Sequence, residues 1–419
     1  MTSSSPDAPA PTTVPGAGTV GDADTVPSAS RLLPTRASQI GLGVAAVMVV
    51  AGPLLVDDDF WMIVLANAGA FAIAAIGLNI LTGYAGQVSI GHAAFLTIGG
   101  YVAAYFGARQ GWPLPLWLLI SGAVGAAIGA LVGPFALRFK GNYLVVVTLA
   151  LLFITVWVVE TWESFTGGFD GASTNAAPLA LGPVDFGELS IFGKDFTREQ
   201  GLFYLAWIVV GVVALVARNL MRTRPGRAMQ AIRDRDIAAE VVGVSNARYK
   251  IAAFAISSCM ASLGGALYAV NLRFISPNSP IEELFISIRF VAIIIVGGLA
   301  TIHGAIVGAL ILGPLPELVQ ENLGLLDFTV PIIDKPLVGG TAADGGVFTA
   351  AAFSEIMFGV LLILFLLFQP TGIAGMSQTL RARLAARRTR RDEEAGTTGS
   401  SEVAQKGTED PAARQGLEK

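Results

Sequence analysis

The chain contains about ten apolar segments, each near the ~20 residues that a helix needs to cross a lipid bilayer. The segments cover residues 37–56, 60–82, 88–107, 114–137, 143–161, 201–220, 251–272, 286–300, 302–320 and 351–369. A content of 53% apolar and 14% charged residues, with a mean hydropathy of +0.64, also lies outside the range of soluble globular proteins. Because lipid offers the backbone no hydrogen-bond partners, we predict an all-α, polytopic membrane protein with about ten transmembrane helices. The eighth and ninth segments are short and separated by a break at 300–304, so some helices are expected to be broken or re-entrant.

Basic residues indicate the orientation of these helices. The basic residues at 31–36, 138–140 and 222–250 and those from Arg381 onward all fall on one face of the membrane if the number of spans is even. The loops of the other face hold the acidic groups at 57–59, 162–200, 282–283 and 321–344. Because positively charged loops stay on the cytoplasmic side, we predict a multi-pass protein of the bacterial plasma (inner) membrane with both termini in the cytoplasm.

The two ends of the chain differ in composition from its middle. Residues 1–36 are mostly Ser, Thr, Pro, Ala, Gly and Asp, and residues 376–419 are polar and of mixed charge. Such segments bury too little apolar surface to fold, so we expect disordered cytoplasmic tails. The first tail has neither the basic start nor the apolar core of a signal peptide. Residues 37–375 are then the transmembrane domain, with a cytoplasmic loop at 221–250.

Several functions are disfavoured by what the sequence lacks. It contains no G-x-x-x-x-G-K-[ST] phosphate-binding loop, so the chain is not expected to hydrolyse ATP itself. Ionisable side chains such as Glu160, Arg218, Arg289 and Glu355 lie near the ends of the predicted segments, which argues against a proton- or sodium-coupled carrier. With His92 and His303 as the only histidines and no nucleophile–base pair, we expect no catalytic residues, no metal site and no cofactor.

A polar, glycine-rich stretch, Gly77-Leu-Asn-Ile-Leu-Thr-Gly-Tyr-Ala-Gly-Gln-Val-Ser-Ile-Gly-His-Ala-Ala-Phe95, interrupts two apolar segments. Its polar groups need hydrogen-bond partners at or near membrane depth, and its glycines permit close backbone approach. Two interpretations fit: polar contacts that hold helices together, or a gate or translocation path lined by neutral groups. The candidate residues for the second are Asn79, Gly83, Gly86, Gln87, Ser89, Gly91 and His92.

The loop at 221–250 has the pattern of two short helices. Pro225 can begin the first, Asp236 can cap a second that starts at Ile237, and Gly243 can end it. An apolar side of the second helix, made of Ala238, Ala239, Val241 and Val242, is flanked by Arg227, Arg233, Arg235 and Glu240. That pattern suits docking into a groove on a partner, although a merely solvated basic loop is the alternative. The candidate coupling residues are Gly226, Arg227, Asp236, Ala238, Ala239, Glu240 and Gly243.

The stretch at 77–95 resembles the signature of the LivM-type permeases of branched-chain amino-acid ABC importers. Further similar motifs follow in order at 138–143, 166–171, 226–233, 237–243, 248–254, 297–299 and 369–373. The resemblance covers about residues 60 to 375. It implies a permease that works by alternating access, a LivH-like second permease subunit, two cytoplasmic ATPase subunits that move the helix at 237–243, and an extracytoplasmic solute-binding protein. One departure is that the importer signature often reads Glu-Ala-Ala, whereas this chain reads Ala238-Ala239-Glu240.

The solute is expected to be small and either zwitterionic or neutral, because the predicted spans hold no charge away from their ends to compensate a charged one. The polar residues at 79–92 lie next to Phe95 and Ile98, which adds aliphatic and aromatic character. Leucine, isoleucine or valine fit this combination, as the resemblance also implies. A urea or short-amide permease of the same family, or a stand-alone secondary carrier, are the alternatives.

Overall fold

The computed structural model describes residues 58–138, 143–191, 194–277, 280–321 and 350–368, and the short pieces 52–53, 329–330, 335–336, 338–339, 348–349 and 372–373. The elements below belong to one compact unit, Pro53–Lys419. The two predicted tails and, apart from residues 52–53, the first predicted span lie outside the described residues.

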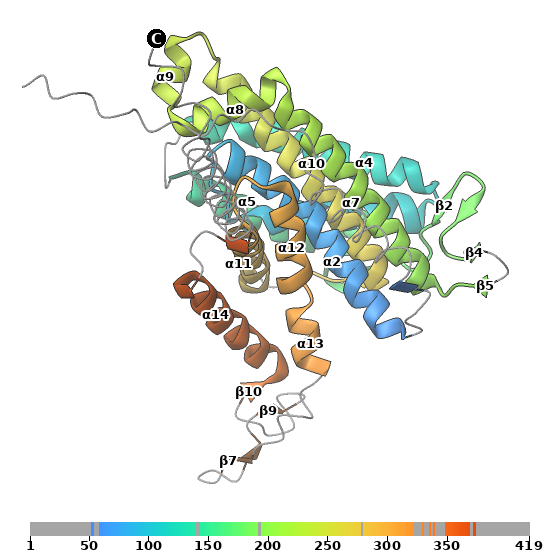
Figure 1. The fold of residues 1–419 in the computed structure, drawn as a ribbon. Helices are drawn as coiled ribbons and strands as arrows, with labels where there is room; N and C mark the ends of the chain where they lie inside the picture. The colour runs from blue at the N-terminus through green and yellow to red at the C-terminus, as the bar shows by residue number, and fades with distance from the viewer. Residues whose placement is uncertain are drawn as a thin grey trace, which may run out of the picture. The chain divides into compact units, whose positions relative to one another are not determined.

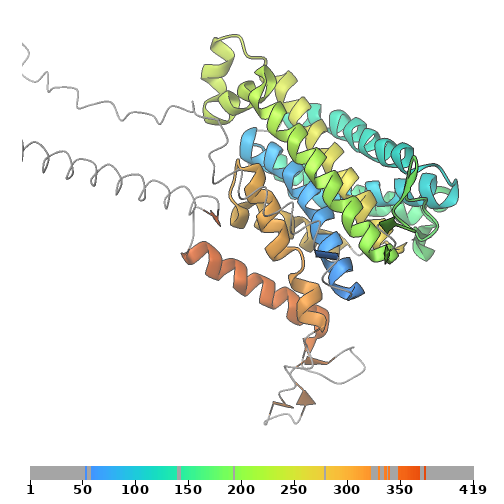
Figure 2. The same cartoon turned by 45° about the vertical axis from the view of Figure 1, so that its right-hand side comes forward.

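Helices of 7 to 27 residues, most of them apolar, make up most of the described part of the chain (Figures 1 and 2). They include α2 (Asp59–Leu78), α3 (His92–Val102), α4 (Leu114–Arg138), α5 (Tyr143–Thr161), α7 (Arg198–Arg222), α10 (Asn246–Leu272), α11 (Pro280–Gly297), α12 (Ile302–Leu312), α13 (Leu315–Glu321) and α14 (Ala350–Phe368). Each predicted span from 60–82 onward overlaps one of these helices or a consecutive pair, and the span 88–107 covers α3 and most of the π-helical stretch η2 (Ala103–Arg109). Six helical stretches among the described residues are long and apolar enough to cross a membrane. The protein is therefore an all-α, multi-pass membrane protein, and the total of ten spans stays a prediction.

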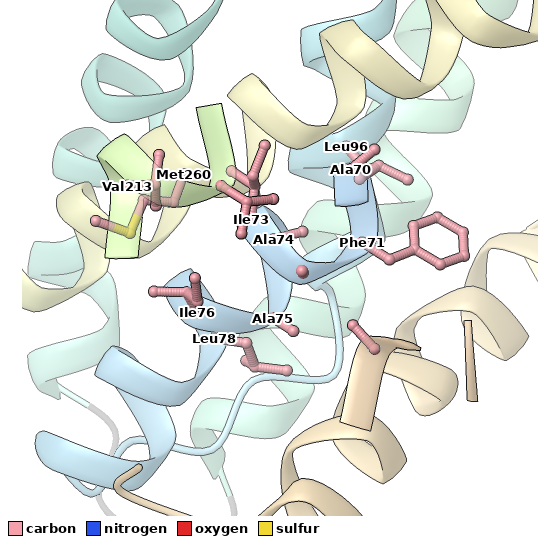
Figure 3. Close-up of a cluster of buried hydrophobic side chains, with 14 of the residues drawn as sticks. Ala70, Phe71, Ile73, Ala74, Ala75, Ile76, Leu78, Leu96, Val213 and Met260 are labelled. Atoms are coloured by element: carbon pink, nitrogen blue, oxygen red, sulfur yellow. The ribbon is translucent and has the colours of Figure 1, made fainter. Parts of the chain in front are cut away.

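Helix α10 lies at the centre of the packing, against α4, α2 and α3, while α2 also packs against α7 and α12. Helix α2 is apolar all round, and a helix of that kind is stable only when other helices cover it on every side. Figure 3 shows its side chains, among them Phe71, Ile73 and Ile76, together with Leu96 of α3, Val213 of α7 and Met260 of α10. Phe71, Ile73 and Ile76 are each at most 1% exposed.

Small residues bring α10 close to its neighbours. On α4, glycines recur every three or four residues and face α10: Gly122, Gly125, Gly129 and Gly133. On α3, a Cβ at Gly99 would collide with the carbonyl oxygen of Ser262, and one at Gly265 of α10 would collide with that of Leu96. Because lipid gives helices no hydrophobic reason to associate, such close backbone contact is a main source of their packing energy.

Short helices and two-residue strands lie in the connections. The loop between α5 and α7 holds α6 (Glu163–Thr166), a 3-10 turn η3 (Gly168–Asp170) and the hairpins β2 (Ala180–Leu181) with β3 (Val184–Asp185) and β4 (Ser190–Ile191) with β5 (Lys194–Asp195). In the same loop β1 (Ala172–Ser173) pairs with β6 (Phe274–Ile275), which follows α10. Further short pairings join β7 (Thr329–Val330) to β8 (Lys335–Pro336) and β9 (Val338–Gly339) to β10 (Phe348–Thr349).

The loops at 162–197 and 223–245 lie at opposite ends of α7. A helix of 25 residues is about 37 Å long at 1.5 Å per residue, which is enough to separate them by a membrane. Figure 1 shows α8 and α9 at one end of this helix and β4 and β5 at the other. The arrangement agrees with the predicted opposition of the acidic and the basic loop.

One part of the sequence interpretation was wrong. We placed Glu283 in a loop and Arg289 near the end of a span, but α11 begins at Pro280, so Arg289 lies in the middle of this helix. Glu283 is 3% exposed and accepts a hydrogen bond of 2.7 Å from the Thr97 hydroxyl, and the Arg289 guanidinium lies 5.8 Å from the centre of the Phe358 ring. Hydropathy does not detect the first turn of α11, because two glutamates make that turn acidic.

Candidate gate and coupling site

Helix α2 does not end as a regular α-helix. It continues as a π-helical stretch, η1 (Asn79–Tyr84), in which Ala85 N–H bonds to the Ile80 carbonyl and Gln87 N–H to the Leu81 carbonyl, both at 3.0 Å. Gly86 then turns the chain with a φ of +71°, a conformation that side chains disfavour. Helix α3 begins only at His92. The polar stretch that the sequence singled out is therefore a true helix break, and π-helical turns of this kind are frequent at functional sites.

A second break separates α11 from α12. Gly298 has a φ of 119° and Ala300 a φ of 58°, and the Thr301 hydroxyl donates a 2.7 Å hydrogen bond to the Gly298 carbonyl. The sequence predicted a break at 300–304, and the structure places it at 298–301. A left-handed alanine costs free energy, so surrounding contacts must hold this turn in place.

Asn79 provides such contacts and joins the two breaks. Its amide nitrogen donates to the Thr301 carbonyl, and its amide oxygen accepts from Ala300 N–H, both at 2.8 Å. The side chain is 1% exposed. Both ends of the amide are thus used to satisfy backbone groups that the break removes from regular helical bonding.

Two glycines, Gly83 and Gly372, allow the backbone of two other segments to contact the α11–α12 break closely. A Cβ at Gly83 of η1 would lie 2.5 Å from the nitrogen of Ala300, and a Cβ at Gly372 would lie 2.9 Å from the Cα of Gly298. Cβ atoms do not approach other atoms this closely, so both positions require glycine. Gly372, a described residue of the motif at 369–373, therefore meets the α11–α12 break, although the two segments are distant in the sequence. We call this meeting point of 79–86, 298–301 and 372 the double break.

The remaining members of the predicted gate lie between η1 and the start of α3. His92 is 1% exposed, and its Nε2 bonds to the Ala74 carbonyl of α2 at 3.0 Å. Ile90 N–H donates to the Thr148 hydroxyl of α5, and a Cβ at Gly91 would collide with the Thr148 carbonyl. Gly91 and His92 thus fasten α3 to its neighbours, which agrees with the packing interpretation for these two residues.

Gln87 and Ser89 differ from the other polar residues of the stretch. They are 6% and 1% exposed, and within the described part of the chain the Gln87 Oε1 and Ser89 Oγ atoms have no hydrogen-bond partner. Buried polar atoms without partners are costly, and each needs an explanation, of which a functional role is one. Of the seven predicted residues, Asn79, Gly83 and Gly86 thus belong to the double break, and Gln87 and Ser89 offer unused polar atoms next to it.

The loop at 221–250 forms the two helices that its pattern predicts, α8 (Arg224–Asp234) and α9 (Asp236–Val241). Pro225 lies in the first turn of α8, and Gly226 is buried against the backbone of Met221. Arg235, with an extended backbone, occupies the N-cap position of α9, one residue earlier than expected. The Asp236 carboxylate accepts from Ile237 N–H at 2.9 Å. Gly243, with a φ of 88°, follows the end of α9.

The apolar side of α9 differs from the predicted one. Ala239 is only 4% exposed and packs within the chain, whereas Ile237, Val241 and Val242 are 75%, 83% and 79% exposed. Ala238, Glu240 and Arg227 are exposed, as a docking role requires. Asn246 at the start of α10 holds α9 through hydrogen bonds to the Asp236 carbonyl and the Glu240 carboxylate. The exposed surface is thus Ile237, Ala238, Val241 and Val242, which we call the docking face.

Helix α8 also touches the double break. The Nη1 atom of Arg233 donates to the Gly83 carbonyl at 2.7 Å, and a Cβ at Gly86 would lie 3.0 Å from the Arg233 Cγ. From the sequence, Arg233 is a flanking charge of α9 and the last residue of the motif at 226–233. Neither this contact nor the meeting of Gly372 with Gly298 has a local sequence pattern, because each joins segments far apart in the chain.

Apolar helices of membrane-spanning length, interrupted by two linked helix breaks, define a polytopic membrane protein. Comparison of sequences gives the family: the family model described as "Branched-chain amino acid transport system / permease component" matches residues 61–366. The chain belongs to this family.

Three curated permeases illustrate the range of its relatives. The high-affinity branched-chain amino acid transport system permease protein LivM of Escherichia coli (strain K12) is 28% identical over 322 residues, 74% of this chain and 68% of the relative. LivH of the same strain is 24% identical, with 73% of this chain and 91% of the relative covered. The ribose import permease protein RbsC of Haemophilus influenzae (strain ATCC 51907 / DSM 11121 / KW20 / Rd) is 24% identical, with 70% and 88% covered. No solved structure matches the chain significantly.

Proposed function

We propose that this protein is one permease subunit of an ATP-driven importer of leucine, isoleucine and valine in a bacterial inner membrane. The observation that carries the proposal is the docking face: three large aliphatic side chains lie exposed on a short helix between charged residues. Exposed apolar surface of this kind outside a membrane span marks a contact with a partner. Separate cytoplasmic ATPase subunits that dock there would drive alternating access in the domain at 37–375.

The other partners follow from the relatives. LivM and LivH are both named as permeases of high-affinity branched-chain amino acid transport systems, and this chain is similar to each. We therefore expect a LivH-like companion permease. The resemblance to ABC importers implies the remaining partners, two cytoplasmic ATPase subunits and an extracytoplasmic solute-binding protein that delivers the solute.

The solute assignment rests on the family and on the site together. The similarity to a ribose import permease shows that the fold by itself does not determine the solute. The groups beside the double break, Gln87 and Ser89, are neutral, and neutral groups can pass a zwitterion without an unpaired ion in the membrane. Phe95, which is buried, and Ile98, which is partly buried, supply apolar side chains on α3 shortly after this stretch. Urea fits the polar groups alone and is the closest alternative.

Uptake in a deletion strain tests the solute. Loss of the gene is expected to reduce the uptake of radiolabelled leucine, and in the parent strain excess isoleucine and valine, but not urea, should compete. The matched control is the deletion strain that carries the gene on a plasmid. Intact leucine uptake together with lost urea uptake would transfer the assignment to a urea or short-amide permease.

A further inference from the structure

The hydrogen bond between Arg233 and Gly83 connects the helix next to the docking face with the double break. We infer that Arg233 is a positioning residue that transmits movement of α8 and α9 to the double break. This inference rests on the proposed function, because it needs an ATPase to move the docking face. Beyond the proposed function, it states that one side chain carries the coupling between the docking face and the double break.

Helix α8 can act as a stiff lever. Its inner side chains, Met229 and Ile232, are 1% and 4% exposed, and Gly226 allows the helix to pack directly on the end of α7. Arg235 bends the chain from α8 into α9 without a flexible linker. A displacement of the docking face is therefore passed to the Arg233 end of α8.

The Gly83 carbonyl is free to accept the hydrogen bond from Arg233 because it lacks its usual helical donor. In a regular helix it would accept from the N–H of Gln87, but that N–H bonds to the Leu81 carbonyl instead. Carbonyls at a helix end lack intrahelical donors and carry partial negative charge, so a guanidinium binds there favourably. Arg233 thus replaces a bond that the π-helical turn has removed.

The path continues from Gly83 into the second break. Gly83 is in close contact with Ala300, and four residues earlier Asn79 bonds to both Ala300 and Thr301. Movement of the Gly83 carbonyl therefore changes the positions of both helix breaks together. A bond that is made in one state and broken in the other would bias their equilibrium, as coupling between two sites requires.

Asp234 holds the guanidinium in position. Its carboxylate accepts from Arg233 Nε at 3.0 Å and lies 2.9 Å from Nη2, which leaves Nη1 for Gly83. The side chains of Arg233 and Asp234 are 37% and 64% exposed, so this ion pair contributes little stability. Its effect is to orient the donor.

The test compares Arg233→Gln, Arg233→Lys and the control Arg224→Gln, an exposed arginine at the other end of α8. Each full complex is purified, reconstituted in lipid vesicles, and assayed for ATP hydrolysed and leucine taken up. For Arg233→Gln we expect the ATPases to stay bound and hydrolysis to continue, while leucine uptake per ATP falls by about tenfold, within the usual range of coupling between sites. Arg233→Lys keeps a charged donor, so its leucine uptake per ATP should lie between those of Arg233→Gln and the parent. Arg224→Gln should have the same uptake per ATP as the parent.

Three results would overturn the inference. An unchanged ratio of uptake to hydrolysis in Arg233→Gln would show that the contact carries no coupling. Loss of the ATPases from that variant would make Arg233 a docking residue. An equal fall in leucine uptake per ATP in Arg233→Gln and Arg224→Gln would assign the effect to the positive charge of the loop and not to the contact with Gly83. A parent complex without ATPases, or one that takes up no leucine, would instead refute the proposed function.

Discussion

The side-chain amide of Asn79 bonds to two consecutive residues of the α11–α12 break. Its oxygen accepts from Ala300 N–H and its nitrogen donates to the Thr301 carbonyl, at 2.8 Å each. This relationship ties a π-helical turn of one helix to the break of another. It also explains why a polar side chain lies 1% exposed in an apolar bundle: the side chain supplies the partners that the backbone lacks there.

Replacement of Asn79 by leucine should therefore destabilise the protein and stop uptake. It leaves the Ala300 N–H and the Thr301 carbonyl without these partners, at a cost of about 1–3 kcal/mol for each buried group. Thermal unfolding in detergent measures the loss, and Thr155→Val is the control, because that buried hydroxyl donates to the Leu151 carbonyl within its own helix. Equal stability of the two variants would contradict the role of Asn79.

The contact between α3 and α10 should tolerate no side chain at Gly265. A Cβ there would meet the Leu96 carbonyl, so Gly265→Ala is expected to destabilise by about 1–3 kcal/mol, as overpacking usually does. Gly211 of α7 has open space around it, and Gly211→Ala should change stability by less than about 1 kcal/mol. The fraction of each variant that stays monodisperse after heating distinguishes the two. If Gly265→Ala were as stable as the parent protein, α3 and α10 would not lie this close together.

The sequence predicted the elements well and their mutual contacts poorly. Hydropathy located the helices from 60–82 onward, and the Pro225, Asp236 and Gly243 signals located α8 and α9, because each depends on neighbouring residues. The start of α11 was missed, since Glu282 and Glu283 lower the hydropathy of a turn that the bundle nevertheless includes.

The same difference applies to the candidate site. The stretch at 77–95 could be recognised as a break from its glycines and amides. The exposure of Ile237 instead of Ala239 depends on how α9 turns against α10, and the Arg233–Gly83 bond joins residues 150 positions apart. Such contacts depend on tertiary packing, which local patterns do not specify.

Reporter fusions test the orientation of the bundle. A reporter after Arg224 and one after Arg391 should both read cytoplasmic, whereas one near Asp185 should read external, because Arg224 and Asp185 lie beyond opposite ends of α7. The same location for the Arg224 and Asp185 fusions would contradict the span assigned to α7.

The docking face should fail when its apolar character is removed. Val241 is 83% exposed, so Val241→Asp is expected to leave the permease folded but reduce co-purified ATPase by about tenfold, equivalent to about 1.4 kcal/mol. Val184→Asp, at an exposed valine beyond the other end of α7, is the control. Ala239→Arg is less informative, because Ala239 is buried and its loss would disrupt α9 itself. Normal ATPase binding by Val241→Asp would remove the docking role from this face.

The composition of the purified assembly tests the central claim most directly. The tagged chain, extracted in mild detergent and analysed by mass spectrometry, should bring with it a second permease and two copies of ATPase subunits in constant ratio. The family and the docking face both predict this result. If the chain purifies alone and still takes up leucine when reconstituted alone in vesicles, it is a stand-alone carrier, and the account of a permease driven by separate ATPases is wrong.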